Sequence, residues 1–582
     1  MKKRKFTRFF IIYFFTGAFF ALCIGRLVYL QGFTDNASRK AVETMLSLNR
    51  RDIAPRGLIT DRNSTVLAGN RQGYTVTVTK GSDELLAVTV KNLSEYRGVS
   101  FHRLLSEMQE QNFSKNNPFV FSEDASWELI TKIKESPEKY PCANIITRPV
   151  RDYPYPESAV HILGRCGIIS REEYEKNQSY HRDDFIGKQG TERAFENILR
   201  GVDGSAPIEK NAGGNLRTFT QSVSPIPGKN VILTIDLPLQ QKTEEALAQT
   251  VKQYGATGGA FVIVDVNSGE VLSSASYPTY NVNDFSKNYT KLSKDKNKPF
   301  FNRCLSGLYA PGSTFKPITA IAAMESGNLI PNEKIKTTGK YEYYGHTFRC
   351  NIFRTTNKTH GVIDVKQALG VSCNWFFYEL GKRTGIDKIH QTAHLFGLDS
   401  PTGIELTVEE ATGIAASPEN RILRGGYWYA GDTLQAAIGQ SDNMFTPIAL
   451  ANYTAAIANG GTLYRLHILK GIQTPDGNTE YTKPQVLSKI NMQKETLDTV
   501  RQGMLCVTES GTAAEIFKDF DVSVSGKTGS AQVAHATNGL FTGFAPSEHP
   551  EIAFCVVIEG APSGNTAATA AKNMLSYYFD TE

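Results

Sequence analysis

The hydrophobic pattern of the chain begins with a basic segment followed by a long apolar run. Residues 1–8 carry five lysines and arginines, and residues 9–25 are uncharged and rich in Phe, Ile, Leu and Ala. With residues 27–30, the run approaches the roughly 20 residues that a membrane-spanning helix needs. We expect a cytoplasmic tail at 1–8 and a transmembrane anchor at 9–31, with the rest of the chain outside, because basic flanks stay inside. A cleaved signal peptide is the alternative, but no Ala-x-Ala-like cleavage site follows the run.

Residues 45–205 alternate short extended runs with amphipathic helical patterns. Residues 74–78 alternate as a strand does, and residues 125–135 have the apolar spacing of a helix. No pattern of nucleophile and base is visible in this region. We therefore expect an α+β pedestal or partner-binding domain in which arginines and acids form structural ion pairs. A linker rich in Gly, Ser, Thr and Pro is expected at 206–230.

The remainder, 231–582, has the pattern of one antiparallel sheet with helices against it and a helical insertion. Two apolar runs at 260–266 and 270–275 are joined by Asn-Ser-Gly, which predicts a hairpin. Residues 551–559 are almost continuously apolar, as in a central strand, and residues 566–579 predict a closing helix. The fold class is therefore α/β and multidomain, with two lobes and a cleft in this last domain.

Composition and charge limit the number of domains and the kinds of ligand that the chain can bind. The 582 residues are too many for one core. The first 31 residues hold six of the 63 basic residues and no acids, so the rest is nearly neutral and no nucleic-acid-binding patch is indicated. Eight cysteines are too sparse for a disulfide framework. His390 and His394 lack the intervening Glu of zinc proteases, so no metal and no other cofactor is expected.

Candidate chemistry begins at Ser313 and Lys316, which follow a Pro-Gly turn at the start of an Ala-rich helical pattern. Three positions apart on a helix, their side chains lie on one face within about 6 Å. A lysine desolvated by apolar neighbours can lose its proton and accept the one that a serine nucleophile sheds. Lys316 is the only charged residue between Arg303 and Glu325, and a lone lysine in such a segment is costly unless it has a task.

Two further motifs follow along the chain. They are Ser372-x-Asn374 and Lys527-Thr528-Gly529. Together with the Ser-x-x-Lys pair, and in this order, they resemble the three motifs of the penicillin-recognising serine enzymes. The resemblance implies the penicillin-recognising serine transpeptidase fold, in which an antiparallel sheet with helices carries a helical lobe.

The region before these motifs is similar to class B penicillin-binding proteins in particular, and the resemblance covers nearly the whole chain from the anchor onward. The matching segments are Arg56-Gly57-x-Ile59-x-Asp61-Arg62-Asn63, Arg151-x-Tyr153-Pro154, Gly187-x-x-Gly190-x-Glu192, and Ile438-Gly439-Gln440 with Thr446-Pro447. Two positions depart mildly from the family pattern. Thr191 stands where Leu is common, and Ser530 stands where Thr is common but keeps a hydroxyl.

The resemblance implies a peptidoglycan D,D-transpeptidase that is a target of β-lactams. Ser313 would attack the carbonyl between two terminal D-alanines of a stem peptide, and Lys316 would take its proton. Ser372 would relay a proton to the departing D-alanine, and Asn374 would hydrogen-bond the substrate peptide. Lys527 would supply positive potential for the terminal carboxylate. An amine from a second stem peptide would then resolve the acyl-enzyme.

The strand that carries the last motif would also bind substrate. The hydroxyls of Thr528 and Ser530 would hold the terminal carboxylate, and Gly529 permits a close backbone approach. The backbone N–H groups of Ser313 and Ser530 would form the oxyanion hole. The donor peptide would add to the Lys527 strand as a further strand.

Three alternatives share these motifs. A β-lactamase-like protein would lack a pedestal, and a membrane β-lactam sensor would need a larger cytoplasmic module than eight residues. A catalytically inactive scaffold of the cell-wall machinery is the third alternative, although intact motifs argue against it. No glycosyltransferase domain is visible, so the family implies that glycan polymerisation comes from a polytopic membrane glycosyltransferase partner.

Cys373 lies inside the Ser-x-Asn motif, and Cys350 is the nearest other cysteine in the sequence. A disulfide between them would tie the Ser372 loop to the rim of the cleft and would be stabilising outside the cytoplasm. Two reduced cysteines, one of them packed behind the motif as a small apolar residue, are the favoured interpretation.

Overall fold

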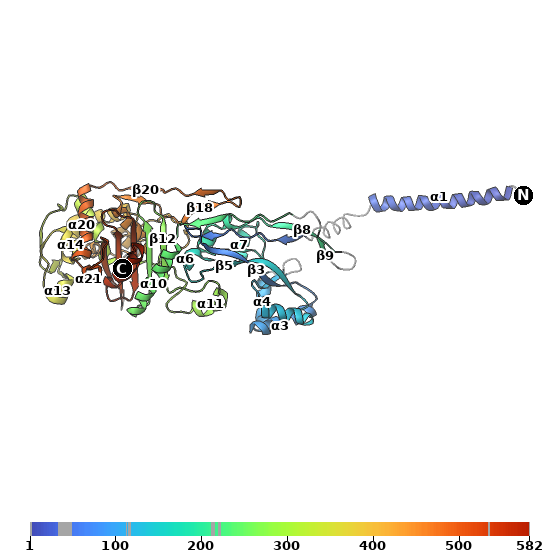
Figure 1. Ribbon diagram of the computed structural model, residues 1–582, viewed down its shortest axis with the longest axis horizontal. Coiled ribbons are helices and arrows are strands. Elements are labelled where there is room, and N and C mark those ends of the chain that lie inside the picture. The colour runs from blue at the N-terminus through green and yellow to red at the C-terminus, as the bar shows by residue number, and fades with distance from the viewer. Residues whose placement is uncertain are drawn as a thin grey trace. The chain divides into compact units, whose positions relative to one another are not determined.

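The chain forms two compact units in a computed structural model (Figure 1). One unit consists of residues 1–55 and 201–227, and the other consists of residues 56–200 and 228–582. The structure describes residues 3–32, 49–111, 113, 118–210, 216–218, 223–533 and 536–580.

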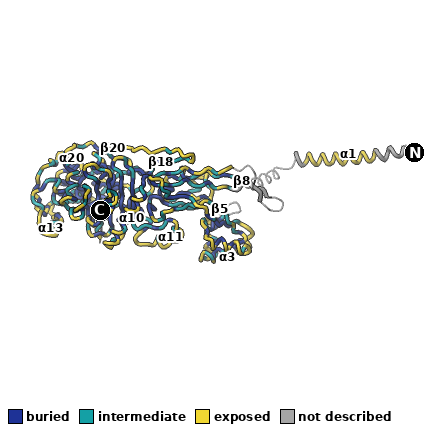
Figure 2. The backbone as a smooth tube through the Cα atoms, in the orientation of Figure 1, coloured by how far each residue is buried: buried dark blue, intermediate teal, exposed yellow. Residues whose placement is uncertain are grey.

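The first unit holds the long apolar helix and a small sheet. Helix α1 (Lys3–Gly32) contains an apolar stretch, Phe10–Tyr29, and is the one helix of the described residues that is long and apolar enough to cross a membrane. Residues 10–29 of this helix are exposed (Figure 2). Strands β1 (Asn49–Asp52), β8 (Gly204–Lys210) and β9 (Leu216–Thr218) pair antiparallel in that order. The stretch expected to be a linker thus includes strand residues, and part of it lies outside the described residues.

A seven-stranded sheet runs through both segments of the second unit. Its strands are β2 (Ile59–Thr60), β3 (Val66–Val78), β4 (Phe119–Ser122), β5 (Ala143–Asp152), β10 (Asn230–Leu233), β18 (Leu469–Gln473) and β19 (Thr479–Tyr481). Strand β10 pairs parallel with β2 and antiparallel with β18. Backbone hydrogen bonds therefore join the pedestal to the C-terminal part of the chain.

Three helices pack beside β3 and β4 and close a core of their own. They are α3 (Asp83–Arg97), α4 (Phe101–Glu110) and α5 (Trp127–Glu135). Each begins directly after a serine whose hydroxyl accepts a hydrogen bond from a backbone N–H of the first turn, which satisfies one otherwise unpaired donor. The helix expected at 125–135 is confirmed as α5, and the strand expected at 74–78 is the end of β3.

The C-terminal part is built on a five-stranded antiparallel sheet. Its order is β12 (Val271–Tyr277), β11 (Gly258–Asp265), β23 (Ile552–Glu559), β22 (Ala536–Ala545) and β21 (Ser525–Val533). The expected hairpin is confirmed as β11 and β12, and the expected central strand is confirmed as β23. Strand β21 lies at the edge of this sheet.

Helices cover both faces of the five-stranded sheet, as the almost complete burial of its strands requires (Figure 2). Phe261 points into a core with α10 (Leu237–Gln253) and the closing helix α22 (Gly564–Tyr578). Its neighbour Val262 points into the opposite core, which includes α19 (Pro447–Ala458). Successive residues of a strand face opposite sides, so a strand that is buried on both faces is apolar at most of its positions.

Five helices of the insertion surround the candidate motifs. They are α12 (Lys316–Glu325), α14 (Val365–Gly370), α15 (Asn374–Thr384), α18 (Ala430–Ala437) and α20 (Lys494–Glu509). Helix α12 is buried at every position except its last. A helix that is apolar all round belongs in the interior, and this one carries a single lysine into the core.

Candidate active site

Ser313 lies on a 3₁₀ turn, η2 (Gly312–Phe315), which runs directly into α12. Side chains three residues apart eclipse one another on such a turn. Gly312 has a φ of +53°, and a Cβ at this position would come within 2.8 Å of the Ser530 carbonyl oxygen. Its N–H donates to the carbonyl of Gly439 at 2.9 Å. The turn is therefore seated against β21, and the Ser313 side chain remains partly exposed.

Lys316 is fully buried, and its ammonium group contacts the second motif. Its Nζ donates to Ser372 O at 2.8 Å, to Ser372 Oγ at 3.1 Å and to Asn374 Oδ1 at 2.7 Å. Burial lowers the pKa of Lys316 to about 8, because an apolar environment disfavours the charged form. With a pKa of about 8, this lysine can lose its proton near physiological pH, as a general base must.

Ser372 lies between α14 and α15 in the left-handed region, with a φ of +54°. Such a conformation is costly for a residue with a side chain and is held by its surroundings. Its Oγ accepts hydrogen bonds from Lys316 Nζ at 3.1 Å and from Lys527 Nζ at 3.0 Å. With both lone pairs used as acceptors, the hydroxyl hydrogen is free to point outward as a donor.

Lys527 reaches the same hydroxyl from β21. Its side chain is fully buried, and Nζ also donates to the carbonyl of Thr528 at 3.1 Å. Burial lowers the pKa of Lys527, and the nearby positive charge of Lys316 lowers it further. The two lysines, from α12 and β21, therefore donate to the same serine oxygen.

The remaining predicted site residues follow Lys527 along β21. A Cβ on Gly529 would approach the carbonyl oxygen of Pro311 to 2.7 Å, so glycine allows the strand to lie against the turn that carries the nucleophile. Ser530 Oγ accepts a hydrogen bond from the N–H of Gly564 at 3.1 Å. Thr528 is buried, with its hydroxyl beside that of a residue from another segment.

That other residue is Thr512, which sequence reasoning missed. It follows α20, and its Oγ1 lies 2.6 Å from Thr528 Oγ1. No periodicity or motif in the sequence singles it out, because its place depends on how α20 packs against β21 and α14. Of the residues that the sequence analysis named, Lys316 hydrogen-bonds Ser372 and Asn374, and Lys527 hydrogen-bonds Ser372. Gly529 and Ser530 lie against the turn that carries Ser313, while no hydrogen bond within the described residues joins Ser313 Oγ to another site residue.

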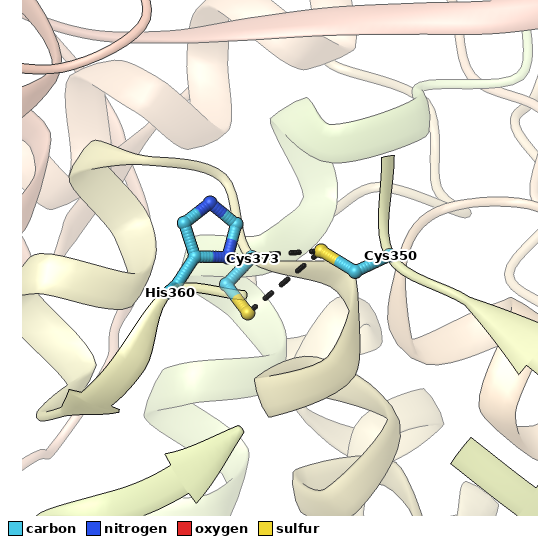
Figure 3. A group of neighbouring side chains, drawn as sticks. All are labelled: Cys350, His360 and Cys373. Atoms are coloured by element: carbon cyan, nitrogen blue, oxygen red, sulfur yellow. Dashed lines mark hydrogen bonds between the residues drawn. The ribbon is translucent and has the colours of Figure 1, made fainter. Parts of the chain in front are cut away.

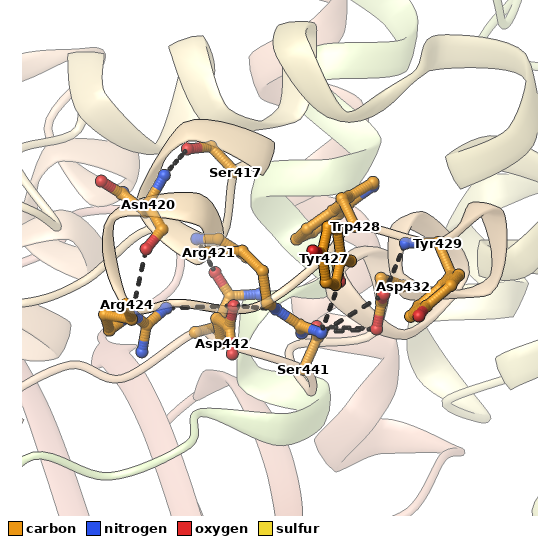
Figure 4. A network of polar contacts seen from close by, with 12 residues as sticks. Ser417, Asn420, Arg421, Arg424, Tyr427, Trp428, Tyr429, Asp432, Ser441 and Asp442 are labelled. Atoms are coloured by element: carbon orange, nitrogen blue, oxygen red, sulfur yellow. Dashed lines mark hydrogen bonds and ion pairs between the residues drawn. The ribbon is translucent and has the colours of Figure 1, made fainter.

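A network centred on Arg421 supports the segment after the Ile438-Gly439-Gln440 turn (Figure 4). Arg421 forms ion pairs with Asp432 and Asp442 and donates to Ser441 Oγ at 2.8 Å. Ser441 has a φ of +59°. Planar guanidinium groups suit this role because they donate in several fixed directions at once. The network fixes the segment whose glycine carbonyl receives the Gly312 N–H.

A group of soft side chains lies behind the second motif (Figure 3). Cys350 Sγ is 3.9 Å from Cys373 Sγ and 3.8 Å from His360 Nδ1, and both cysteines are free thiols. All three ligand atoms lie within 4.8 Å of one another. Two thiolates and an imidazole are ligands that zinc accepts, although structural zinc sites use four. Sequence analysis expected no metal site, and His360 was not singled out there.

In the pedestal, the expected ion pairs converge on Glu192, which is fully buried. Its two oxygens accept from Arg56 and Arg151, both at 2.6 Å, and from the hydroxyl of Tyr153 at 3.2 Å. Burial alone would raise the pKa of Glu192, but the two guanidinium groups outweigh it and lower the pKa to about 2. The prediction that these charges are structural and pin distant segments together is confirmed.

Two protein-family models match the chain. One describes the penicillin binding protein transpeptidase domain and matches residues 259–576, and the other describes the penicillin-binding protein dimerisation domain and matches residues 51–233.

Relatives of known function and structure extend over most of the chain. The peptidoglycan D,D-transpeptidase MrdA of Acinetobacter baumannii is 30% identical over 554 residues, which cover 90% of this chain and 80% of that protein. The penicillin-binding protein PBP2 from Helicobacter pylori, solved in complex with MreC, superposes with a TM-score of 0.79 at 25% identity, covering 91% of this chain and 99% of that one. A chain in a solved peptidoglycan synthase complex that coordinates polymerisation and crosslinking superposes with a TM-score of 0.71 at 27% identity. The match covers 100% of this chain and 99% of that one.

Proposed function

Because the chain belongs to the class B penicillin-binding proteins, with their dimerisation and transpeptidase domains, we propose that it is a peptidoglycan D,D-transpeptidase that cross-links stem peptides through a serine acyl-enzyme. One observation carries the proposal. The three motifs meet at a single oxygen, Ser372 Oγ, which accepts from Lys316 at 3.1 Å and from Lys527 at 3.0 Å.

The first half-reaction forms the acyl-enzyme. Ser313 Oγ attacks the carbonyl carbon between the two terminal D-alanines while neutral Lys316 takes its proton. The tetrahedral oxyanion lies at the backbone N–H groups of Ser313 and Ser530, and each such donor contributes about 3 kcal/mol to transition-state stabilisation. The C–N bond then breaks, and D-alanine leaves with a proton from the Ser372 hydroxyl, which is resupplied from protonated Lys316.

The second half-reaction transfers the acyl group. An amine of another stem peptide attacks the ester carbonyl and gives up a proton through the same Ser372 and Lys316 pair. The new C–N bond forms, the ester bond to Ser313 breaks, and the serine recovers its proton. Burial of Lys316 supports both directions of transfer, because a pKa of about 8 lets the amine give and take a proton near neutral pH.

Recognition of the donor peptide belongs to β21. Lys527 supplies positive potential for the terminal carboxylate, and the hydroxyls of Thr528 and Ser530 donate to it. Asn374 hydrogen-bonds the peptide backbone of the donor. Because β21 is the edge strand of its sheet, an extended peptide can add to it through main-chain hydrogen bonds. β-Lactams, which carry an acylating carbonyl and a carboxylate, occupy the same site.

The protein works at a membrane and with a partner. Helix α1 anchors it, with residues 1–8 on the cytoplasmic side and the transpeptidase domain outside. The partner is a polytopic membrane glycosyltransferase that polymerises the glycan. The similarity to a chain of a solved peptidoglycan synthase complex supports this assignment.

Labelling of the full-length protein in detergent with a fluorescent penicillin tests the proposal. We expect one covalent label, mapped to Ser313 by peptide mass spectrometry and lost in Ser313→Ala. Ser326→Ala is the matched control, because this hydroxyl at the end of α12 bonds, among the described residues, its own helix and Asn328 alone. A label elsewhere would overturn the assignment, and no label at all would favour an inactive scaffold.

A β-lactamase-like enzyme or a β-lactam sensor would also become labelled, so the labelled protein is followed over time. A transpeptidase keeps the penicilloyl group for many minutes, whereas a β-lactamase hydrolyses it. Formation of penicillin-sensitive stem-peptide dimers, in the presence of a glycosyltransferase and lipid-linked substrate, separates the transpeptidase from a sensor.

A further inference from the structure

Thr512 is a hydroxyl next to the site that the mechanism above does not use. Its Oγ1 lies 2.6 Å from Thr528 Oγ1, and its backbone N–H donates to the carbonyl of Gly370 at 3.1 Å. Gly370 ends α14, two positions before Ser372. Thr512 thus bonds to the strand that carries Lys527 and to the segment that carries the second motif.

The position of Thr512 is fixed by its neighbours in the chain. A Cβ on Gly511 would come within 2.2 Å of the Gly370 carbonyl oxygen and 2.7 Å of that of Cys506, so only glycine allows this packing. On the other side, the N–H of Ala513 donates to the carbonyl of Val507 at 2.9 Å. The Thr512 hydroxyl therefore reaches Thr528 from a loop that is held by backbone hydrogen bonds on both sides and by the close packing of Gly511.

The number of donors and acceptors on the two threonine hydroxyls indicates what the contact between Thr512 and Thr528 does. A threonine hydroxyl has one hydrogen and two acceptor positions. Thr528 can donate to a substrate carboxylate only if its single hydrogen is not already used. Thr528 Oγ1 is the one hydrogen-bond partner of Thr512 Oγ1 in the described part of the chain. When Thr512 donates to Thr528, it fills an acceptor position and leaves the Thr528 hydrogen directed at the carboxylate, and such chained hydroxyls also polarise one another.

We propose that Thr512 is a positioning residue for the donor carboxylate: its hydroxyl orients Thr528 and couples the Lys527 strand to the Ser372 segment. This inference rests on the proposed transpeptidase function and adds a determinant of selectivity for donors that end in a free carboxylate. Loss of the hydroxyl weakens recognition of that carboxylate and leaves the acyl-transfer chemistry at Ser313 in place.

The test compares two acyl donors on the full-length protein in detergent. One is an N-acyl-D-alanyl thioester that ends in a free carboxylate, and the other is the same compound with that carboxylate as a methyl ester. The Thr512→Val variant removes the hydroxyl at nearly constant volume. We expect kcat/KM for the carboxylate donor to fall about tenfold, as for loss of a charge-assisted hydrogen bond, and kcat/KM for the ester to change by less than about twofold. Thr512→Ser, which restores the hydroxyl, is expected to recover most of the preference.

Thr508→Val is the matched control, because this buried hydroxyl of α20 donates to the carbonyls of Leu505 and Val524 and, within the described residues, to no motif residue. Melting temperatures of all variants are measured in parallel, and Thr512→Ala repeats the test should the valine variant fold poorly. Equal losses for both donors in the Thr512 variants, or the same change of preference in Thr508→Val, would overturn the inference. Wild-type protein that reacts with neither donor would instead refute the proposed function.

Discussion

The acylation rate is expected to follow the protonation of Lys316. Burial lowers the pKa of Lys316 from 10.5 to about 8, so Lys316 is neutral in about one tenth of the protein molecules at pH 7. An exposed lysine would be about 0.03% neutral at the same pH, so burial increases the concentration of the base about 300-fold. Because only the neutral form accepts the Ser313 proton, the acylation rate rises with pH as Lys316 loses its own proton.

Stopped-flow acylation by a fluorescent penicillin, measured between pH 5.5 and 9.5, gives the profile. We expect a tenfold increase per pH unit at low pH, a midpoint near 8 and a plateau above it. Lys316→Arg keeps the positive charge but cannot lose its proton, so we expect the rate to fall by about 10²- to 10⁴-fold and the rising limb to disappear.

Two results would refute this reasoning. A midpoint near 10 in the wild-type protein would mean that burial does not control the base. A Lys316→Arg variant with an unchanged profile would mean that another group accepts the proton. Melting temperatures and circular dichroism of the variant exclude a trivial loss of fold as the cause.

Further predictions concern three other parts of the molecule. Lys527→Arg is expected to retain measurable acylation where Lys316→Ala has none, because an electrostatic anchor need only stay charged; equal loss in both would mean that the roles are misassigned. Glu192→Gln is expected to destabilise the pedestal by about 3 kcal/mol at pH 7, from a pKa lowered from 4.5 to about 2. In chemical denaturation, the free energy of unfolding of the wild type is expected to exceed that of the variant above pH 4.5, and this difference is expected to disappear as the pH falls toward about 2. A difference that does not depend on pH would contradict the prediction. Cys350 and Cys373 are expected to be reduced in protein purified without reductant, because their sulfur atoms lie 3.9 Å apart without a bond; alkylation before and after reduction, followed by mass spectrometry, checks this, and a bridged peptide would refute it.

Much of the fold could be predicted from the sequence because buried strands and helices have distinct periodicities. The two apolar runs around Asn267-Ser268-Gly269, the continuous apolar run at 551–559 and the closing helix all form as expected, with boundaries shifted by a few residues. The strand that carries Lys527 begins at Ser525. Small polar residues before it fit an extended strand or a loop equally well, so pattern alone does not place the boundary.

The candidate site was predictable to the extent that its chemistry lies in short motifs. Ser313 and Lys316 are three positions apart, so the geometry of a single turn predicts that their side chains lie on one face. The expectation of an α-helix at Ser313 missed the 3₁₀ turn, which depends on the fit of Gly312 against Ser530. The convergence of Lys316 and Lys527 on Ser372 was expected only through resemblance, since no local rule brings residues so far apart in sequence to one oxygen.

The sequence by itself determined the long apolar helix near the N-terminus, the alternation of strands and helices, and the residue types of the three motifs. These features are local, and each is encoded in the spacing of apolar and polar side chains over one element. Tertiary structure alone decided the meeting of Thr512 with Thr528, the approach of His360 to two cysteines and the lowered pKa of Lys316. Contacts and burial of this kind depend on how distant elements pack against one another. A pattern read along one element carries no information about which other element will cover it, and so the chemistry of the site emerges only in the folded chain.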